Sequence, residues 1–322
     1  MKHRKEQGMA AIVLICCLVG GAIVAGTLWK ARDAAGALTP QSSALAGEAT
    51  EDYGKRLIER TTEYLGPDVR DVTKRYAGNR LACASCHINA GLEPGSLSLA
   101  TAVERYPRQS PRSGSKESIE ERINGCMTRS MAGRRLPENS PEMKAMVAYL
   151  NRLSAENAAT GASRRKAHDP ADLKTPARKA NLKAGEQVFA KRCAACHQDD
   201  GQGLPASADL RDGFVLPPLW GPNSFNDGAG MHRVITAARF IKAKMPLGSA
   251  DLTDDEAFDV AAFINSKPRP EMAHLDEDYP DKTKKPVDAG FPPFADPFPL
   301  EQHRFGPFAP IEAFYKKLKP AK

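Results

Sequence analysis

Apolar residues recur at helical spacing in four stretches of this chain. The four stretches, with their inward residues, are 52–65 with Leu57, Ile58, Thr61 and Leu65; the segment after Ser140 with Met143, Val147, Leu150 and Leu153; a short stretch around Val188 and Phe189; and the segment after Thr253 with Ala257, Val260, Ala261 and Ile264. Ser140 before Pro141 marks a helix start, because serine caps helices and proline suits the first helical position. Thr253 and Glu256 form a capping box. The pattern predicts an all-α protein.

The N-terminus has a separate apolar pattern. Basic residues at positions 2–5 precede an apolar run from Met9 to Trp29, which at about 20 residues is long enough to span a bilayer. Basic residues before such a run are typical of export signals. We therefore interpret residues 1–32 as a signal peptide or an N-terminal membrane anchor, and 33–50 as a linker. Ala35-Gly36-Ala37 offers a late cleavage site, and either form places the rest of the chain in the periplasm.

Two C-x-x-C-H motifs interrupt the helical segments: Cys83, Cys86 and His87 form the first, and Cys193, Cys196 and His197 the second. Two cysteines at this spacing can form thioethers to a haem, and the following histidine can ligate its iron. A redox-active cysteine pair or half of a zinc site is the alternative. A zinc site needs four ligands, however, and the histidine follows at once in both copies. The motifs predict two covalently bound haem c groups.

Helix, motif, irregular loop, distal ligand and closing helix follow one another twice, which is the order of a class I cytochrome c domain. We predict two such domains in tandem, at residues 51–154 and 180–267. Residues 155–179, rich in Ala, Arg, Lys and Pro, are interpreted as a linker.

Residues 268–322 differ in composition from the rest of the chain, since they hold eleven of the 25 prolines and six of the 12 phenylalanines. Prolines at this density predict an extended segment without regular helix or sheet. Disordered segments are poor in aromatic residues. We therefore predict a C-terminal tail that packs on the two haem domains.

The sixth ligand of each iron sets its reactivity. In the second domain Met245, which precedes Pro246 in the loop before the closing helix, is the predicted ligand opposite His197. The competing residues are Met231, His232 and Lys244.

In the first domain Cys126 occupies the corresponding region, with Met127 and Met131 as competitors. A lone cysteine can also be a small buried apolar residue. However, Cys126 is the one cysteine of the exported body outside the motifs, where an idle thiol would be prone to oxidation. Residues 104–135 carry eight Arg or Lys against four Glu, which favours a thiolate.

The formal net charge of +7 fits a small anionic substrate or an acidic redox partner. No recognition module or basic–aromatic pattern supports nucleic-acid binding.

Four segments carry a resemblance to a known family: R-I-N-G-C-M-T-R-S-M-A-G at 122–133, K-M-P-L-G at 244–248, and the tail motifs at 281–288 and 301–308. In these the chain resembles the thiosulfate dehydrogenases, periplasmic dihaem cytochromes that join two thiosulfates into tetrathionate. The resemblance covers about residues 50–315.

The resemblance implies roles by position. Cys126 would be the distal thiolate opposite His87, and Met245, exchanging with Lys244 on change of redox state, would lie opposite His197. The implied substrate-pocket residues are Arg122, Ser130 and Arg112, with Arg108 as an alternative to Arg112. The second haem would pass two electrons to an external acceptor such as a small cytochrome c.

Two other functions compete with this one. A non-catalytic dihaem electron carrier would be expected to have His/Met ligation at both haems, so Cys126 argues against it. A Sox-like cytochrome would conjugate thiosulfate to a cysteine of a carrier protein, but the Met245 domain and the Phe-rich tail favour the dehydrogenase. The sequence leaves open the physiological direction and the identity of the acceptor.

Overall fold

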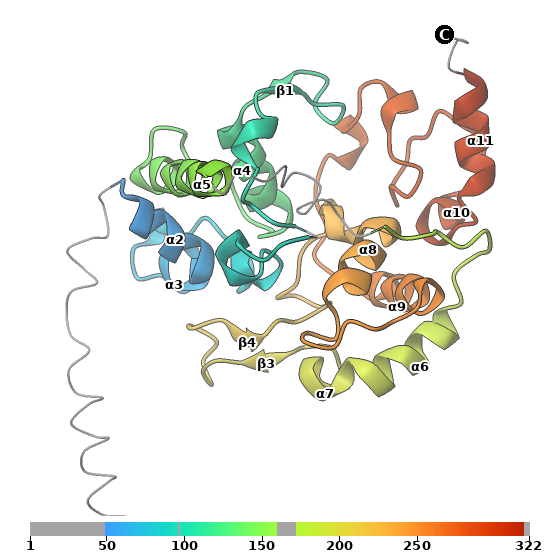
Figure 1. Ribbon diagram of the computed structural model, residues 1–322, viewed down its shortest axis with the longest axis horizontal. Coiled ribbons are helices and arrows are strands. Elements are labelled where there is room, and N and C mark those ends of the chain that lie inside the picture. The colour runs from blue at the N-terminus through green and yellow to red at the C-terminus, as the bar shows by residue number, and fades with distance from the viewer. Residues whose placement is uncertain (1–48, 96, 160–171, 319–322) are drawn as a thin grey trace, which may run out of the picture. The chain divides into compact units, whose positions relative to one another are not determined.

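The computed structural model of the chain describes residues 49–95, 97–159 and 172–318 (Figure 1). Its helices are α2 (Glu51–Glu59), α3 (Thr61–Leu65), α4 (Ile119–Arg129), α5 (Pro141–Ala159), α6 (Leu182–Arg192), α7 (Ala194–His197), α8 (Val234–Lys244), α9 (Asp254–Ser266), α10 (Leu300–Phe305) and α11 (Ala309–Leu318). The predicted export segment lies outside the described residues. Within the described residues, no helix has the length and apolar character needed to cross a membrane.

The described residues contain only short strands. β1 (Arg108–Gln109) pairs with β2 (Lys116–Glu117), and β3 (Leu204–Pro205) pairs with β4 (Phe214–Leu216), both antiparallel. The predicted all-α class is confirmed.

The first domain (α2–α5) is built on a close crossing of α2 and α5 (Figure 1). A Cβ atom on Gly54 of α2 would lie 2.0 Å from the carbonyl oxygen of Ala145 in α5, so only glycine permits this approach. Leu57, Met143 and Tyr149 are fully buried around the crossing.

The second domain (α6–α9) repeats this arrangement. A Cβ atom on Gly185 of α6 would lie 2.1 Å from the carbonyl oxygen of Asp259 in α9. Helix α9 begins after Thr253, whose hydroxyl accepts a hydrogen bond from the Glu256 N–H, as the predicted capping box requires. In both domains, therefore, a glycine in the first helix (α2 or α6) lets that helix pack closely against the backbone of the last helix (α5 or α9).

The helix predicted over 52–65 is divided into α2 and α3. Arg60 leaves helical geometry (φ −130°, ψ 43°). Thr61 follows, and its hydroxyl donates to the Leu57 carbonyl (2.7 Å) and accepts the Cys83 N–H (3.0 Å). The break thus places a side chain that fixes the start of the first C-x-x-C-H motif.

The start of the linker predicted at residues 155–179 differs from the structure as well. Helix α5 starts at Pro141, as predicted, but continues to Ala159, so residues 155–159 are helical. Of the linker, residues 160–171 lie outside the described part.

The tail packs on the second domain and also on the first, where the Tyr279 N–H donates to the Arg112 carbonyl (2.7 Å). The prediction that it contains no regular helix is wrong. Phe305, Phe308 and Ile311 are buried in the same cluster as Phe258 of α9. Helices α10 and α11 form because the prolines lie outside their interiors. Pro299 is the N-cap of α10, and Pro310 lies in the first turn of α11, where its missing N–H costs little.

A buried polar cluster holds the tail segments together. The Asp296 carboxylate accepts hydrogen bonds from His303 Nε2 (3.0 Å) and from the Tyr315 hydroxyl, while His303 Nδ1 donates to the Val287 carbonyl (2.8 Å). The Asp296 side chain is 0% exposed. Burial opposes ionisation, but these hydrogen bonds, with that from the Phe298 N–H, lower the pKa of Asp296.

We predict that Asp296→Ala costs about 3–5 kcal/mol of unfolding free energy, because it leaves buried hydrogen-bonding groups unpaired. Urea unfolding of the haem-loaded protein measures this loss. Glu301→Ala is the control, since it removes an exposed tail carboxylate paired with Lys179 and should leave the midpoint near that of wild type. Equal shifts in the two variants would contradict the prediction.

Candidate functional site

The first C-x-x-C-H motif forms one turn that directs its three side chains to the same side. The His87 N–H donates to the Cys83 carbonyl (2.9 Å), and Cys86 is the C-cap of the short 3₁₀ helix that begins at Cys83. The ring of His87 is fixed by a hydrogen bond from Nδ1 to the Leu97 carbonyl (2.6 Å). No described residue bonds to Nε2, so this nitrogen is available as a ligand.

The second motif has the same geometry. The His197 N–H donates to the Cys193 carbonyl (2.9 Å), and His197 Nδ1 donates to the Pro217 carbonyl (2.7 Å). Again no described residue bonds to Nε2. The two copies therefore hold their imidazoles in one tautomer, with the proton on Nδ1.

These residues fit covalently attached haem. Burial raises the pKa of Cys83 to about 11 and that of Cys86 to about 12, so both thiols are neutral at pH 7, as suits side chains next to an apolar porphyrin edge. Burial likewise raises the pKa of Cys193 to about 11. Burial also lowers the pKa of His87 and of His197, which keeps both rings neutral and able to ligate metal.

Helix α4 brings Cys126 to the first motif. The helix begins with a capping box between Ser118 and Glu121 and ends at Arg129, so that Cys126 lies in its last turn. The charge of an ionised Cys126 contributes to the raised pKa of both Cys83 and Cys86. The structure thus places the predicted distal cysteine within electrostatic range of the first motif, whereas Met127 and Met131 are buried in the core (1% and 2% exposed).

Arg122 lies one helical turn before Cys126, on the same face of α4. Negative charge on Cys126 would raise the pKa of Arg122, against the effect of burial, so the two side chains lie within electrostatic range of each other. Many protein atoms lie near the Arg122 guanidinium, but the residue still has solvent-accessible surface. An anion can therefore approach both Arg122 and Cys126.

Two tyrosines flank this pair. Tyr106 and Tyr279 both lie within electrostatic range of Arg122, and Tyr106 also lies within range of Cys126. The predicted alternatives Arg108 and Arg112 stack on these rings: Arg108 on Tyr106 (4.9 Å to the centroid) and Arg112 on Tyr279 (5.3 Å). Each of the two arginines thus contacts a tyrosine that lies within electrostatic range of Arg122.

The two arginines differ in how they are held. Arg108 pairs with Glu117 (3.4 Å) on the surface. Arg112 donates to the Asp278 carboxylate (2.9 Å) and to the Gly228 carbonyl (3.2 Å), and Arg129 donates to the same two acceptors. The Arg112 side chain is thus fixed in position by residues of the second half of the chain.

Ser130, the last predicted pocket residue, is the C-cap of α4. Its carbonyl accepts a hydrogen bond from Asn79 Nδ2 (2.9 Å), and its side chain is half-buried.

In the second domain Met245 is the C-cap of α8 and packs against the core that also contacts Cys193. Of its predicted competitors, Met231 packs against the cores of both domains. Lys244 Nζ donates to Glu93 (2.9 Å) and to the Pro94 carbonyl, both in the loop that follows His87. The structure therefore engages Lys244 with the first domain and leaves Met245 in the second.

Two protein families match the chain in tandem. The family described as SoxA/TsdA, cytochrome c domain, matches residues 73–158, and the family described as Cytochrome C oxidase, cbb3-type, subunit III, matches residues 180–264. The thiosulfate dehydrogenase of Stutzerimonas stutzeri (strain A1501) is 34% identical over 285 residues, which cover 85% of this chain and 90% of that protein. The chain belongs to the thiosulfate dehydrogenase family.

Two further family members are similar to it. The thiosulfate dehydrogenase of Allochromatium vinosum is 41% identical over 222 residues, covering 67% of this chain and 77% of that protein. The solved structure of thiosulfate dehydrogenase (TsdBA) from Marichromatium purpuratum, in its as-isolated form, has a TM-score of 0.61 and 32% identity. It matches 74% of this chain, which spans 50% of that one. The family and its two cytochrome c domains make this protein an oxidoreductase with two covalently bound c-type haems.

Sequence reasoning missed Tyr106, Tyr279 and Asp278. The tail motif at 281–288 begins two residues after Tyr279, so its position was a signal that the neighbouring residues contact the site. No spacing rule connects Asp278 with Arg112, because 166 residues separate them.

His232, a predicted competitor for the second iron, provides a test of pH dependence. Its Nδ1 donates to the Asp227 carbonyl (2.8 Å), and burial, aided by Arg269, lowers the pKa of His232 to about 4. The unfolded chain has a histidine pKa of about 6.5 and therefore binds more protons between these values. The unfolding free energy must fall as the pH falls through this window.

We predict that wild type loses about 1–3 kcal/mol more unfolding free energy than His232→Gln between pH of about 7 and about 4.5. Urea unfolding at a series of pH values measures the difference. Parallel profiles for the two proteins would show that His232 is not held neutral by the fold.

Proposed function

We propose that the protein is a periplasmic enzyme that oxidises two thiosulfate ions to one tetrathionate and transfers two electrons to an external acceptor. The observation that carries the proposal is the placement of Cys126, one helical turn from Arg122 and within electrostatic range of the first C-x-x-C-H motif. A sulfur nucleophile, a cation and a redox centre thus share one site. The names of the relatives support thiosulfate as the substrate.

We assign the haem-binding residues by motif and geometry. Cys83 and Cys86 would hold the first haem, with His87 and Cys126 as its iron ligands. Cys193 and Cys196 would hold the second, with His197 and Met245 as its iron ligands. When bound, each haem supplies a one-electron redox centre.

The arginines offset the charge of the substrates. Each thiosulfate is a dianion, so bringing two together costs Coulomb repulsion, which planar guanidinium groups can reduce through paired hydrogen bonds. Arg122 lies one helical turn from Cys126. Arg112 and Arg129 share the single carboxylate of Asp278, which leaves these three residues with net positive charge. Ser130 adds a hydroxyl at the end of the same helix.

Cys126 divides the reaction into two steps. Its thiolate and the sulfane sulfur of one thiosulfate form an S–S bond, which gives Cys–S–S–SO₃⁻ and releases two electrons. The sulfane sulfur of a second thiosulfate then attacks the sulfane sulfur of this adduct. Tetrathionate forms, the bond to Cys126 breaks, and the thiolate is regenerated, so that neither step needs a proton.

The second domain is the exit route for the electrons in this proposal. A thioether ligand such as Met245 would give its iron a higher reduction potential than a thiolate ligand, which would favour electron transfer from the first domain to the second. The acceptor would be an external protein such as a small cytochrome c. The export segment predicted at residues 1–32 places this chemistry in the periplasm, and its retention would anchor the enzyme to the inner membrane.

We predict that Cys126→Ala lowers tetrathionate formation at least about a hundredfold, because the sulfur that carries the intermediate is gone. The assay mixes purified enzyme, thiosulfate and ferricyanide and quantifies tetrathionate. Haem content, measured as the pyridine haemochrome, should stay at two per chain and so controls for maturation. Full turnover in this variant would overturn the role of Cys126.

Arg122→Ala should raise the KM for thiosulfate about tenfold or more, because it removes the cation paired with Cys126. Arg135→Ala is the charge-matched control. Arg135 is exposed and lies 3.9 Å from Glu138, so its loss should leave KM within about twofold of wild type. Equal increases in KM would mean that net charge alone, and not the position of Arg122, attracts the substrate.

A further inference from the structure

The end of α4, just after Cys126, exposes carbonyl groups that need hydrogen-bond donors. A helix leaves its last four carbonyls without partners inside the helix. In α4 the Cys126 carbonyl accepts the Met131 N–H (3.0 Å), and the Met127 carbonyl accepts the Gly133 N–H (2.9 Å). The Arg129 carbonyl accepts the Ala132 N–H (3.2 Å) and a further donor from elsewhere, and the carbonyls of Thr128 and the C-cap Ser130 take side-chain donors from elsewhere.

Asn226, from the second half of the chain, supplies two of these donors. Its side-chain Nδ2 donates to the Thr128 carbonyl (2.9 Å), and its backbone N–H donates to the Arg129 carbonyl (3.2 Å). Its Oδ1 accepts the Gly228 N–H (3.1 Å). Asn226 is 4% exposed, so both ends of its amide are used inside the protein.

The third carbonyl is held by Asn79, which also contacts the same segment. Asn79 Nδ2 donates to the Ser130 carbonyl (2.9 Å) and to the Ser224 carbonyl (3.0 Å). Asn79 and Ser224 are both 0% exposed. One amide thus links the end of α4 to the chain that carries Asn226.

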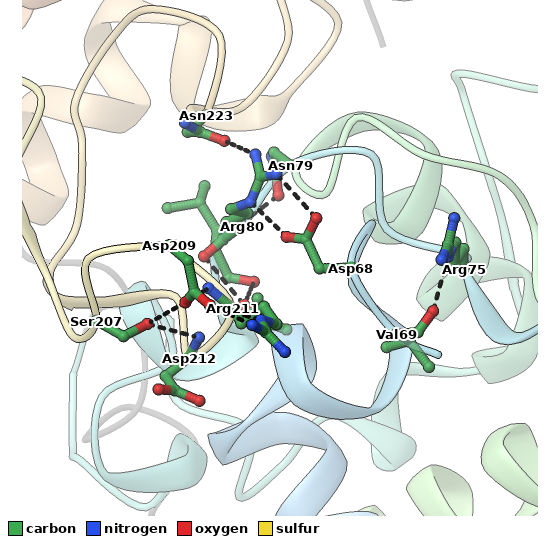
Figure 2. A network of polar contacts seen from close by, with 12 residues as sticks. Asp68, Val69, Arg75, Asn79, Arg80, Ser207, Asp209, Arg211, Asp212 and Asn223 are labelled. Atoms are coloured by element: carbon green, nitrogen blue, oxygen red, sulfur yellow. Dashed lines mark hydrogen bonds and ion pairs between the residues drawn. The ribbon is translucent and has the colours of Figure 1, made fainter. Parts of the chain in front are cut away.

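The segment 223–229 is itself anchored on the first domain at both ends. Arg80 forms a two-bond ion pair with Asp68 and donates to Asn223 Oδ1 (3.0 Å), as Figure 2 shows. Phe225 and Ala229 are buried in the first-domain core together with Met127. The segment therefore cannot move away from α4 without opening that core.

The same segment holds a side chain of α4. The Gly228 carbonyl accepts a hydrogen bond from Arg129 (3.2 Å), whose other nitrogen binds Asp278 (2.7 Å). A Cβ atom on Gly228 would lie 2.8 Å from the Arg129 guanidinium and 2.6 Å from the Met272 sulfur, so a side chain there would displace the ends of these two side chains. Backbone and side chain of Arg129 are thus both fixed by this segment.

We propose that residues 223–229 are a brace that positions Cys126, with Asn226 as its central positioning residue. Cys126 shares the last turn of α4 with Thr128, so loss of the Asn226 amide donor to the Thr128 carbonyl lets this turn fray back toward the cysteine. The second half of the chain thereby sets the placement of the sulfur at the first haem. The proposal rests on the assignment of Cys126 as the distal ligand made under the proposed function.

The test compares full-length, haem-loaded Asn226→Ala with wild type. Electron paramagnetic resonance of the oxidised proteins reports thiolate-ligated and Met-ligated low-spin iron separately. We expect the thiolate signal to fall by more than half or to split into two species, with the Met-ligated signal unchanged. We also expect kcat to fall about 10- to 100-fold, the size of effect known for small misplacements of reacting groups.

Both substitutions keep the backbone donor of residue 226 to Arg129 and remove the amide donor to Thr128. Asn226→Ser is the milder second variant, because its hydroxyl still provides a hydrogen-bonding group at this buried position. It should change the thiolate signal in the same direction but less. The matched control is Asn265→Ala, which removes another buried asparagine of the second half. Asn265 is 2% exposed and bonds to Met231 and Arg269, not to α4. It should leave the thiolate signal and kcat at wild-type values.

Two results would overturn the proposal in distinguishable ways. If both Asn226 variants retain the wild-type thiolate signal and kcat, or if Asn265→Ala alters them equally, the brace does not position Cys126, and the role of Cys126 stands. If wild type itself shows no thiolate ligation, the assignment of Cys126 fails and the brace proposal fails with it.

Discussion

One hydrogen bond per domain, from a histidine Nδ1 to a backbone carbonyl, governs the geometry of both candidate haem sites. His87 donates to Leu97 and His197 donates to Pro217, at 2.6 and 2.7 Å. Each bond fixes the tautomer and leaves Nε2 without a partner among the described residues, and the carbonyl that accepts it comes from the loop after the motif. The packing of that loop therefore decides whether the histidine is ready to ligate. The close helix crossings at Gly54 and Gly185 hold the frame around each loop.

The two domains share this helical frame but differ in the side chains that they supply as candidate distal ligands and substrate-binding groups. In the first, α4 presents Cys126 and Arg122, a sulfur and a cation one turn apart. In the second, Met245 lies at the end of α8 within an apolar core. The repeated scaffold is thus compatible with a division of labour in which one site binds anions and performs sulfur chemistry, while the other transfers electrons. Contacts such as that of Lys244 with Glu93 connect the two sites physically.

The sequence predicted what depends on local spacing. The C-x-x-C-H turns, the start of α5 at Pro141 and the capping box of α9 follow from residues a few positions apart. The break at Arg60 was missed because Thr61 bonds to Cys83, 22 residues away. Helices α10 and α11 were missed because proline content was averaged over the tail, although the prolines lie at or before the first turns. Contacts over long separations, such as Arg112 with Asp278 and Asn226 with Thr128, could not be read from one sequence at all.

The most direct test of the central claim is the stoichiometry of the reaction. Purified protein is incubated with thiosulfate and ferricyanide, and thiosulfate consumed, tetrathionate formed and ferricyanide reduced are counted together. A catalytic first site predicts one tetrathionate for every two thiosulfates consumed and two ferricyanides reduced, sustained over many turnovers. Reduction of no more than the protein's own two haems, with no tetrathionate formed, would contradict the account and leave an electron carrier.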